Sequence, residues 1–171
     1  MPSIKKNIIS RFLSLIPVLL LLFLAFSETD FTFEKLSFLS FNLIYIIIFY
    51  WVLKNPEILG YGFIFLSGIV NDAVVGLPIG VSSVTYLILA WFAAYIRYLT
   101  VQPSIVSDWI VFMPAIAVTN SIYFYILRIF FDINVNYISL LLNTGVTILL
   151  YPVFTILFSF LANKIMKERN V

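Results

Sequence analysis

Six long apolar stretches, separated by short polar turns, restrict the folds open to this chain. Each stretch is close to the roughly 20 residues that a helix needs to cross a bilayer. They run over approximately residues 8–27, 36–53, 58–75, 81–99, 108–131 and 137–162. Ten Lys or Arg and eight Asp or Glu residues are too few to coat a soluble domain of 171 residues, and the mean hydropathy is +1.09. We therefore expect an all-α, polytopic membrane protein: a single integral-membrane domain over residues 1–171, with six transmembrane helices in the lipid bilayer.

The basic residues predict the orientation of these helices. With six spans, both termini lie on the same side of the membrane. Eight of the ten basic residues fall on that side: Lys5, Lys6, Arg11, Lys54, Arg97, Lys164, Lys167 and Arg169. Because cytoplasmic loops carry the excess of Lys and Arg, we expect both termini in the cytoplasm. The net charge of +2 is too small and too dispersed to suggest nucleic-acid binding.

The missing residue types exclude most catalytic chemistry. The chain contains no Cys and no His, which excludes disulfides, thiolate metal sites and every Ser-His or Cys-His mechanism. An aspartyl dyad would need two carboxylates about 3 Å apart. Asp72 and Asp132 are the plausible pair, but Asp132 lies in a turn without the sequence context of such a site. We expect a protein that is not an enzyme and that binds no cofactor or metal.

The third apolar stretch carries small residues and an acid. Its small residues are Gly60, Gly62, Ser67, Gly68 and Ala73. Gly68, Asp72 and Gly76 recur every four residues and therefore share one face of a helix. A carboxylate in such a segment is costly unless it is paired or hydrogen-bonded, so we expect Asp72 to point into the protein. Pro78 and Gly80 then predict a tight reversal into the fourth helix.

The start of the third helix is also suggested by the sequence. In Lys54-Asn55-Pro56-Glu57, Asn55 suits the N-cap, Pro56 the first helical position and Glu57 the positive end of the helix. We therefore expect Asn55 to be the N-cap of this helix and Pro56 its first helical residue.

Other polar residues are expected near Asp72. Asn42 and Asn143 each lie about six residues from the outer end of their predicted helices. At the helical rise this is a depth of roughly 9 Å below the outer membrane surface. We therefore expect a buried polar network of these two residues with Asn71 and Asp72. Arg128 could pair with Asp132, four residues on, or with Asp72 across the bundle. Asn120 is expected to bond one helix to another.

The segment Gly68-Ile-Val-Asn-Asp72-Ala-Val-Val-Gly76-Leu-Pro78-Ile-Gly80 resembles the hallmark of the rod shape-determining protein MreD family. That pattern is a glycine, a few apolar residues, an aspartate, three residues, a glycine, and Pro-x-Gly before the next helix. The chain length, the number of predicted spans and the basic C-terminal tail also agree with this family. Another interpretation is that the segment is only a tightly packed helix hairpin.

The resemblance implies a non-catalytic scaffold of the cell-elongation machinery in the bacterial cytoplasmic membrane, where it controls cell shape. Members of the family bind MreC, which has a single membrane span, and act through it with MreB filaments and the RodA–PBP2 peptidoglycan synthase. We expect a hydrophobic groove, shaped by small residues and proline kinks, to hold the MreC helix. Asp72 and its neighbours would keep the floor of that groove rigid.

A substrate-binding subunit of an energy-coupling-factor vitamin transporter is the alternative. These subunits also have six helices, a similar size and cytoplasmic termini, and the MreD family is thought to be similar to them in fold. Their first helix typically carries an Ala-xxx-Ala docking surface, which residues 12–23 lack. The outer loops expected here are also short and poor in groups that would bind a vitamin.

Overall fold

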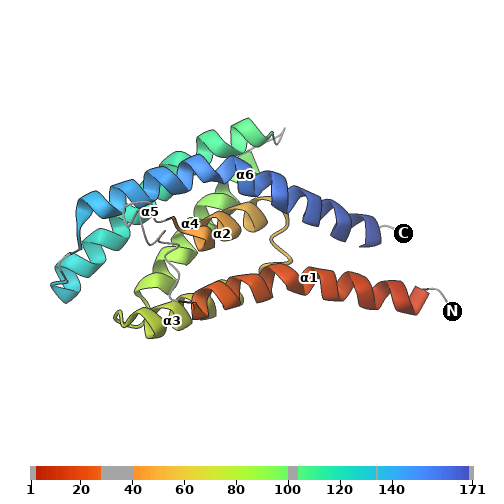
Figure 1. Cartoon of the computed structure of the whole chain (residues 1–171), viewed down its shortest axis with the longest axis horizontal. Coiled ribbons are helices and arrows are strands. Elements are labelled where there is room, and N and C mark those ends of the chain that lie inside the picture. Colours follow the sequence, from red (N-terminus) through yellow and green to blue (C-terminus); the bar gives the residue numbers. More distant parts are fainter. Residues whose placement is uncertain (1–2, 28–40, 100–103, 134, 170–171) are drawn as a thin grey trace, which may run out of the picture.

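The computed structural model describes residues 3–27, 41–99, 104–133 and 135–169, and it describes side chains between residues 15 and 163. The described chain is entirely helical, which confirms the all-α prediction (Figure 1). The helices are α1 (Ser3–Phe26), α2 (Leu43–Lys54), α3 (Tyr61–Val75), α4 (Val81–Leu99), α5 (Ile105–Phe131) and α6 (Tyr137–Arg169).

Helix α2 lies at the centre of the bundle, in contact with α1, α4 and α6 (Figure 1). Residues 44–53 of this helix are all buried, as expected for a helix that is apolar on every side. Phe49 of α2 meets the ring of Phe112 edge-on, with centroids 5.0 Å apart. Phe112 also stacks on Tyr151 at 4.3 Å, so aromatic contacts join α2, α5 and α6 at the centre.

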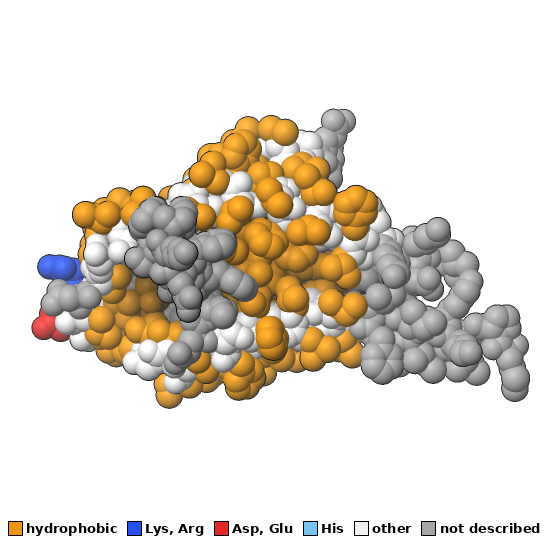
Figure 2. Space-filling model, in the orientation of Figure 1, with side chains coloured by type: hydrophobic (Ala, Val, Ile, Leu, Met, Phe, Trp, Pro, Cys, Tyr) orange, Lys and Arg blue, Asp and Glu red, His pale blue; other side chains and the backbone are white. Residues whose placement is uncertain are grey.

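Among the residues with described side chains, three helices are long and apolar enough to cross a membrane: Val81–Leu99, Ile105–Phe131 and Tyr137–Asn163. Hydrophobic side chains also cover most of the described surface in Figure 2. Helices α2 and α3 have 12 and 15 residues and are shorter than the predicted spans 36–53 and 58–75. At the helical rise they measure about 18 and 22 Å, against about 30 Å of hydrocarbon. Residues 36–40 of the second predicted span lie outside the described residues.

The predicted start of the third helix is wrong. Asn55 is the C-cap of α2 and donates its backbone N–H to the carbonyl oxygen of Trp51 at 2.7 Å. The chain then turns, because the N–H of Ile58 bonds back to the carbonyl of Asn55 at 3.1 Å, and α3 begins only after Gly60. Asn and Pro favour turns as well as helix starts, so their identity alone did not separate the two.

Helices α3 and α4 form a hairpin with very close backbone approach. A Cβ atom on Gly68 would collide with the backbone of Ser83. The hydroxyl of Ser83 donates to the carbonyl of Phe65 at 2.9 Å, which adds a hydrogen bond at the same crossing. In a membrane protein such small-residue contacts replace the hydrophobic drive between helices. The small residues of α3 divide between two faces, since Gly68 is buried whereas Gly62 is exposed.

Replacing Gly68 with Ala should destabilise the protein, because the added methyl group must push α4 away from α3. Overpacking of this kind costs about 1–3 kcal/mol. We expect Gly68→Ala to lower the thermal unfolding midpoint in detergent. Gly62→Ala is the matched control on the same helix, because a Cβ there meets nothing within 4 Å. Equal losses in the two variants would contradict the close-packing role of Gly68.

Candidate functional site

The carboxylate of Asp72 caps helix α4 from the neighbouring helix. Asp72 is fully buried, and its Oδ2 atom accepts a hydrogen bond from the backbone N–H of Gly80 at 2.7 Å. Its Oδ1 atom accepts from the backbone N–H of Ser82 at 3.0 Å. The first amides of a helix have no intrahelical partner and carry partial positive charge. Asp72 therefore satisfies both groups and places a negative charge at the positive end of α4.

The other residues of the glycine-rich motif shape the turn that makes this contact possible. Gly76 ends α3 in the left-handed region, at φ 76°, and its backbone N–H donates to the carbonyl of Asp72. Gly80 has φ 106°, which a side chain would strain. The carbonyl of Pro78 accepts from the N–H of Val81 at 3.3 Å. The motif thus folds as one local unit.

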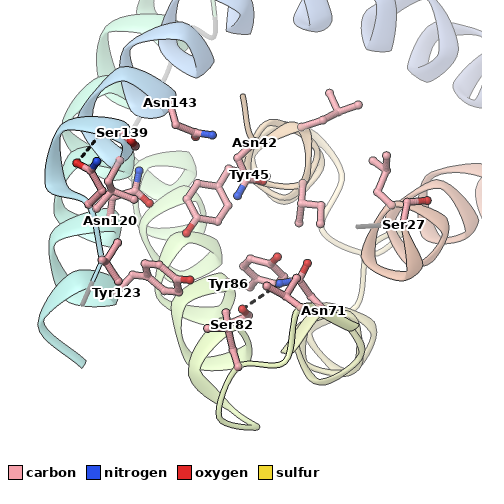
Figure 3. Close-up of a pocket in the computed structure, with 18 residues that line it drawn as sticks. Ser27, Asn42, Tyr45, Asn71, Ser82, Tyr86, Asn120, Tyr123, Ser139 and Asn143 are labelled. Atoms are coloured by element: carbon pink, nitrogen blue, oxygen red, sulfur yellow. Dashed lines mark hydrogen bonds between the residues drawn. The ribbon is translucent and has the colours of Figure 1, made fainter. Parts of the chain in front are cut away.

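Asn71 links this unit to a cavity. Its Nδ2 atom donates to the hydroxyl of Ser82 at 3.1 Å, next to the backbone amide that Asp72 binds. Both residues line a cavity of about 520 Å³ to which all six helices contribute (Figure 3). The polar residues of its wall are Ser27, Asn42, Tyr45, Asn71, Ser82, Tyr86, Asn120, Tyr123, Asn136, Ser139 and Asn143. The cavity differs in this polarity from the hydrophobic groove expected for a partner helix.

The predicted polar network is divided between this cavity and the α3–α4 hairpin. Asn42 and Asn143 both line the cavity and are joined through Thr147. The Thr147 hydroxyl accepts from the backbone N–H of Asn42 at 3.0 Å and donates to the backbone carbonyl of Asn143 at 2.7 Å. Asn71 lies on the same cavity wall, whereas the Asp72 carboxylate is bound to the first amides of α4.

Arg128 does not belong to either group. It lies exposed in the last turn of α5, where a cation interacts favourably with the negative helix end. Within the described residues no ion pair joins it to Asp132 or to Asp72. Asn120 does join two helices as expected, because its Nδ2 atom donates to the hydroxyl of Thr144 on α6 at 2.6 Å.

The sequence analysis missed a buried ion pair between α2 and α5. The Nζ atom of Lys54 lies 2.6 Å from the Oδ2 atom of Asp108, whose side chain is only 3% exposed. Lys54 is in the last turn of α2 and Asp108 in the first turn of α5. Both residues lie at the ends of apolar stretches, and both ends are predicted on the same side of the membrane. This shared position could have suggested the pair from the sequence.

Within the described residues no cluster of three or more Asp or Glu residues could hold a metal ion. Comparisons with protein-family models, curated proteins and solved structures find no match to this chain. The site is therefore interpreted from its own geometry, which offers a cavity whose described lining is polar and uncharged, beside a hairpin fixed by a carboxylate.

Replacing Asp72 with Ala should lower the free energy of unfolding by about 2 kcal/mol, since two helix-start amides lose a charged acceptor. Asp72→Asn should cost less, because its carbonyl oxygen can keep one of the two bonds. Unfolding in detergent micelles, followed by circular dichroism, measures both losses. Asp132→Asn is the control, since Asp132 is exposed and its left-handed backbone suits Asn. The capping role is wrong if the Asp72 and Asp132 variants are equally stable.

Proposed function

We propose that this protein is a non-catalytic membrane scaffold of the bacterial cell-elongation machinery, similar to the MreD family, and that it binds the transmembrane helix of MreC. The observation that carries the proposal is the motif from Gly68 to Gly80, whose glycines, aspartate and proline act together in one hairpin. Its carboxylate is engaged by backbone amides, which favours a structural role over a catalytic one. Through MreC the protein acts indirectly with MreB and the RodA–PBP2 synthase.

The proposed topology has six spans in the cytoplasmic membrane, with both termini in the cytoplasm. The distribution of Lys and Arg supports this orientation. The short helix α2 is compatible with it, because residues 44–53 are all buried and the helix contacts α1, α4 and α6. Non-helical backbone is tolerated at membrane depth where it is buried in protein.

Single-cysteine variants test whether α3 crosses the membrane, since the natural chain has no other thiol. Glu57 is exposed in the turn before α3, and Ile79 is 73% exposed in the turn after it. A membrane-impermeant maleimide should label Ile79→Cys in spheroplasts, and Glu57→Cys only after permeabilisation. Labelling of both variants from the same side would contradict the six-span topology.

We place the MreC helix on the outward face of α3. This helix packs mainly on α1 and α4, and Gly62, Leu66 and Ala73 are exposed on one side of it. A Cβ atom on Gly62 meets nothing within 4 Å, so another backbone can approach closely there. This face lies on the same helix as Asp72, so the cap on α4 also fixes the orientation of the proposed binding surface.

Affinity purification in detergent should recover MreC with the natural chain. Gly62→Leu and Ala73→Leu should reduce that recovery at least fivefold, because the larger side chains keep the MreC backbone away from α3. Gly145→Leu is the matched control, since Gly145 is also exposed and open, but lies on α6. Loss of MreC only in the Gly145 variant would move the contact to α6, and no recovery with the natural chain would refute the function.

A substrate-binding subunit of an energy-coupling-factor transporter is the second candidate function. The cavity of about 520 Å³ favours it, because small-molecule sites have volumes of this order. The same purification separates the two functions: recovery of an ATPase–coupling subunit pair without MreC supports the transporter.

A further inference from the structure

We propose that the open cavity lined by the six helices binds a neutral saccharide, either as a free sugar or as the headgroup of a glycolipid. This inference goes beyond the scaffold function, because it concerns the interior of the bundle and does not depend on MreC. The cavity volume of about 520 Å³ lies within the usual range for small-molecule sites of about 300–1,000 Å³.

The charge of the cavity wall selects a neutral ligand. No Asp, Glu, Lys or Arg is among the described residues that line it. A charged ligand would leave water without a counter-ion among the described residues of the wall, and burying an unpaired charge is strongly unfavourable. Asp72 is close in sequence to Asn71 but does not offer its charge, because its carboxylate is bound to the amides of Gly80 and Ser82.

Three Asn side chains of the cavity wall each form a hydrogen bond within the fold through one of their two polar atoms. The other polar atom of each amide is left for a ligand. Asn71 and Asn120 donate through Nδ2, to Ser82 and to Thr144, and their Oδ1 atoms accept no bond from the described residues. Asn42 accepts through Oδ1 from the N–H of Tyr45, and its Nδ2 donates to none of the described residues. The wall therefore offers two acceptors and one amide donor, a combination that hydroxyl groups satisfy because each both donates and accepts.

Aromatic rings supply the remaining part of such a site. Tyr45 and Tyr86 line the cavity, with ring centroids 5.7 Å apart and planes at 87° (Figure 3). Only 4% of Tyr45 and 3% of Tyr86 is exposed, so the two rings contribute a small apolar edge beside the amides. A C–H group of a sugar ring can pack on that edge while the sugar hydroxyls bond to Asn side chains. A purely apolar ligand would cover the remaining polar atoms of these Asn side chains without giving them partners.

The cavity is situated where a ligand can enter from the outer side of the proposed topology. Leu77 of the α3–α4 turn and Val135 and Asn136 of the α5–α6 turn line it. Both turns lie outside if the termini are cytoplasmic. A free sugar and a glycolipid headgroup in the outer leaflet present the same hydroxyl chemistry there.

Binding to the full-length protein in phosphatidylcholine nanodiscs tests the proposal. Saturation-transfer NMR with methyl β-D-glucoside probes the free sugar, and methyl β-D-glucuronide is the charged analogue. A thermal shift in nanodiscs that contain glucosyl diacylglycerol probes the lipid-linked form. We expect saturable binding of at least one glucoside and no binding of the glucuronide.

Variants locate the binding in the cavity. Asn71→Leu and Asn120→Leu should each weaken it about fivefold to tenfold, the effect of losing one hydrogen bond. Val75→Trp tests the same point without removing a hydrogen bond, because Val75 lines the cavity and is 53% exposed, so a larger side chain fills space with little strain. Asn163→Leu is the control, an exposed amide of α6 outside the cavity.

The proposal is overturned if neither glucoside binds, if the glucuronide binds as well as the glucosides, or if the cavity variants bind like the control. Binding of only the glycolipid supports the proposal and identifies the headgroup as the source. Recovery of MreC is scored on the same preparations. If MreC is recovered but no sugar binds, this inference fails and the scaffold function stands. If sugar binds but MreC is not recovered, the scaffold function fails and this inference stands.

Discussion

The buried carboxylate of Asp72 is the interaction on which the arrangement of α3 and α4 depends. A charge in an apolar bundle is unfavourable unless its oxygens are hydrogen-bonded. Here two backbone amides at the start of α4 supply those bonds, and these amides would otherwise lack partners. Each group removes the desolvation cost of the other, so the contact fixes the position of α4 relative to α3.

The consequences of this contact extend to the cavity. Close approach at Gly68 brings α4 against α3, and the hydrogen bond from Asn71 to Ser82 lies on the cavity side of the same crossing. The central helix α2 contributes Tyr45, and its N-cap residue Asn42, to the lining of the same cavity. Polar groups that the fold satisfies only in part therefore converge on one internal space. The outward face of α3, proposed to bind MreC, is a separate surface of the same hairpin.

Much of the fold could be predicted because lipid restricts the choices available to a chain. Apolar stretches of this length favour helices, and the four-residue spacing of Gly68 and Asp72 predicted the shared face on which both are buried. Gly76, predicted on the same face, instead caps the end of α3 in the left-handed conformation and is exposed. The helix boundaries near Asn55 could not be read in the same way, since a residue that caps one helix end also suits the other. The short lengths of α2 and α3 were also missed, because hydropathy does not distinguish helix from an apolar turn.

The sequence by itself determined the helical class, the apolar character of the chain and the residue types of the hairpin motif, because composition and local spacing carry that information. Only the tertiary structure decided the partners of each polar group. Asp72 bonds to amides at the start of α4 instead of to Arg128, Lys54 meets Asp108, and five Asn residues from distant parts of the chain line one cavity. These pairings depend on how helices far apart in the chain are rotated and packed, and a local pattern does not contain that rotation.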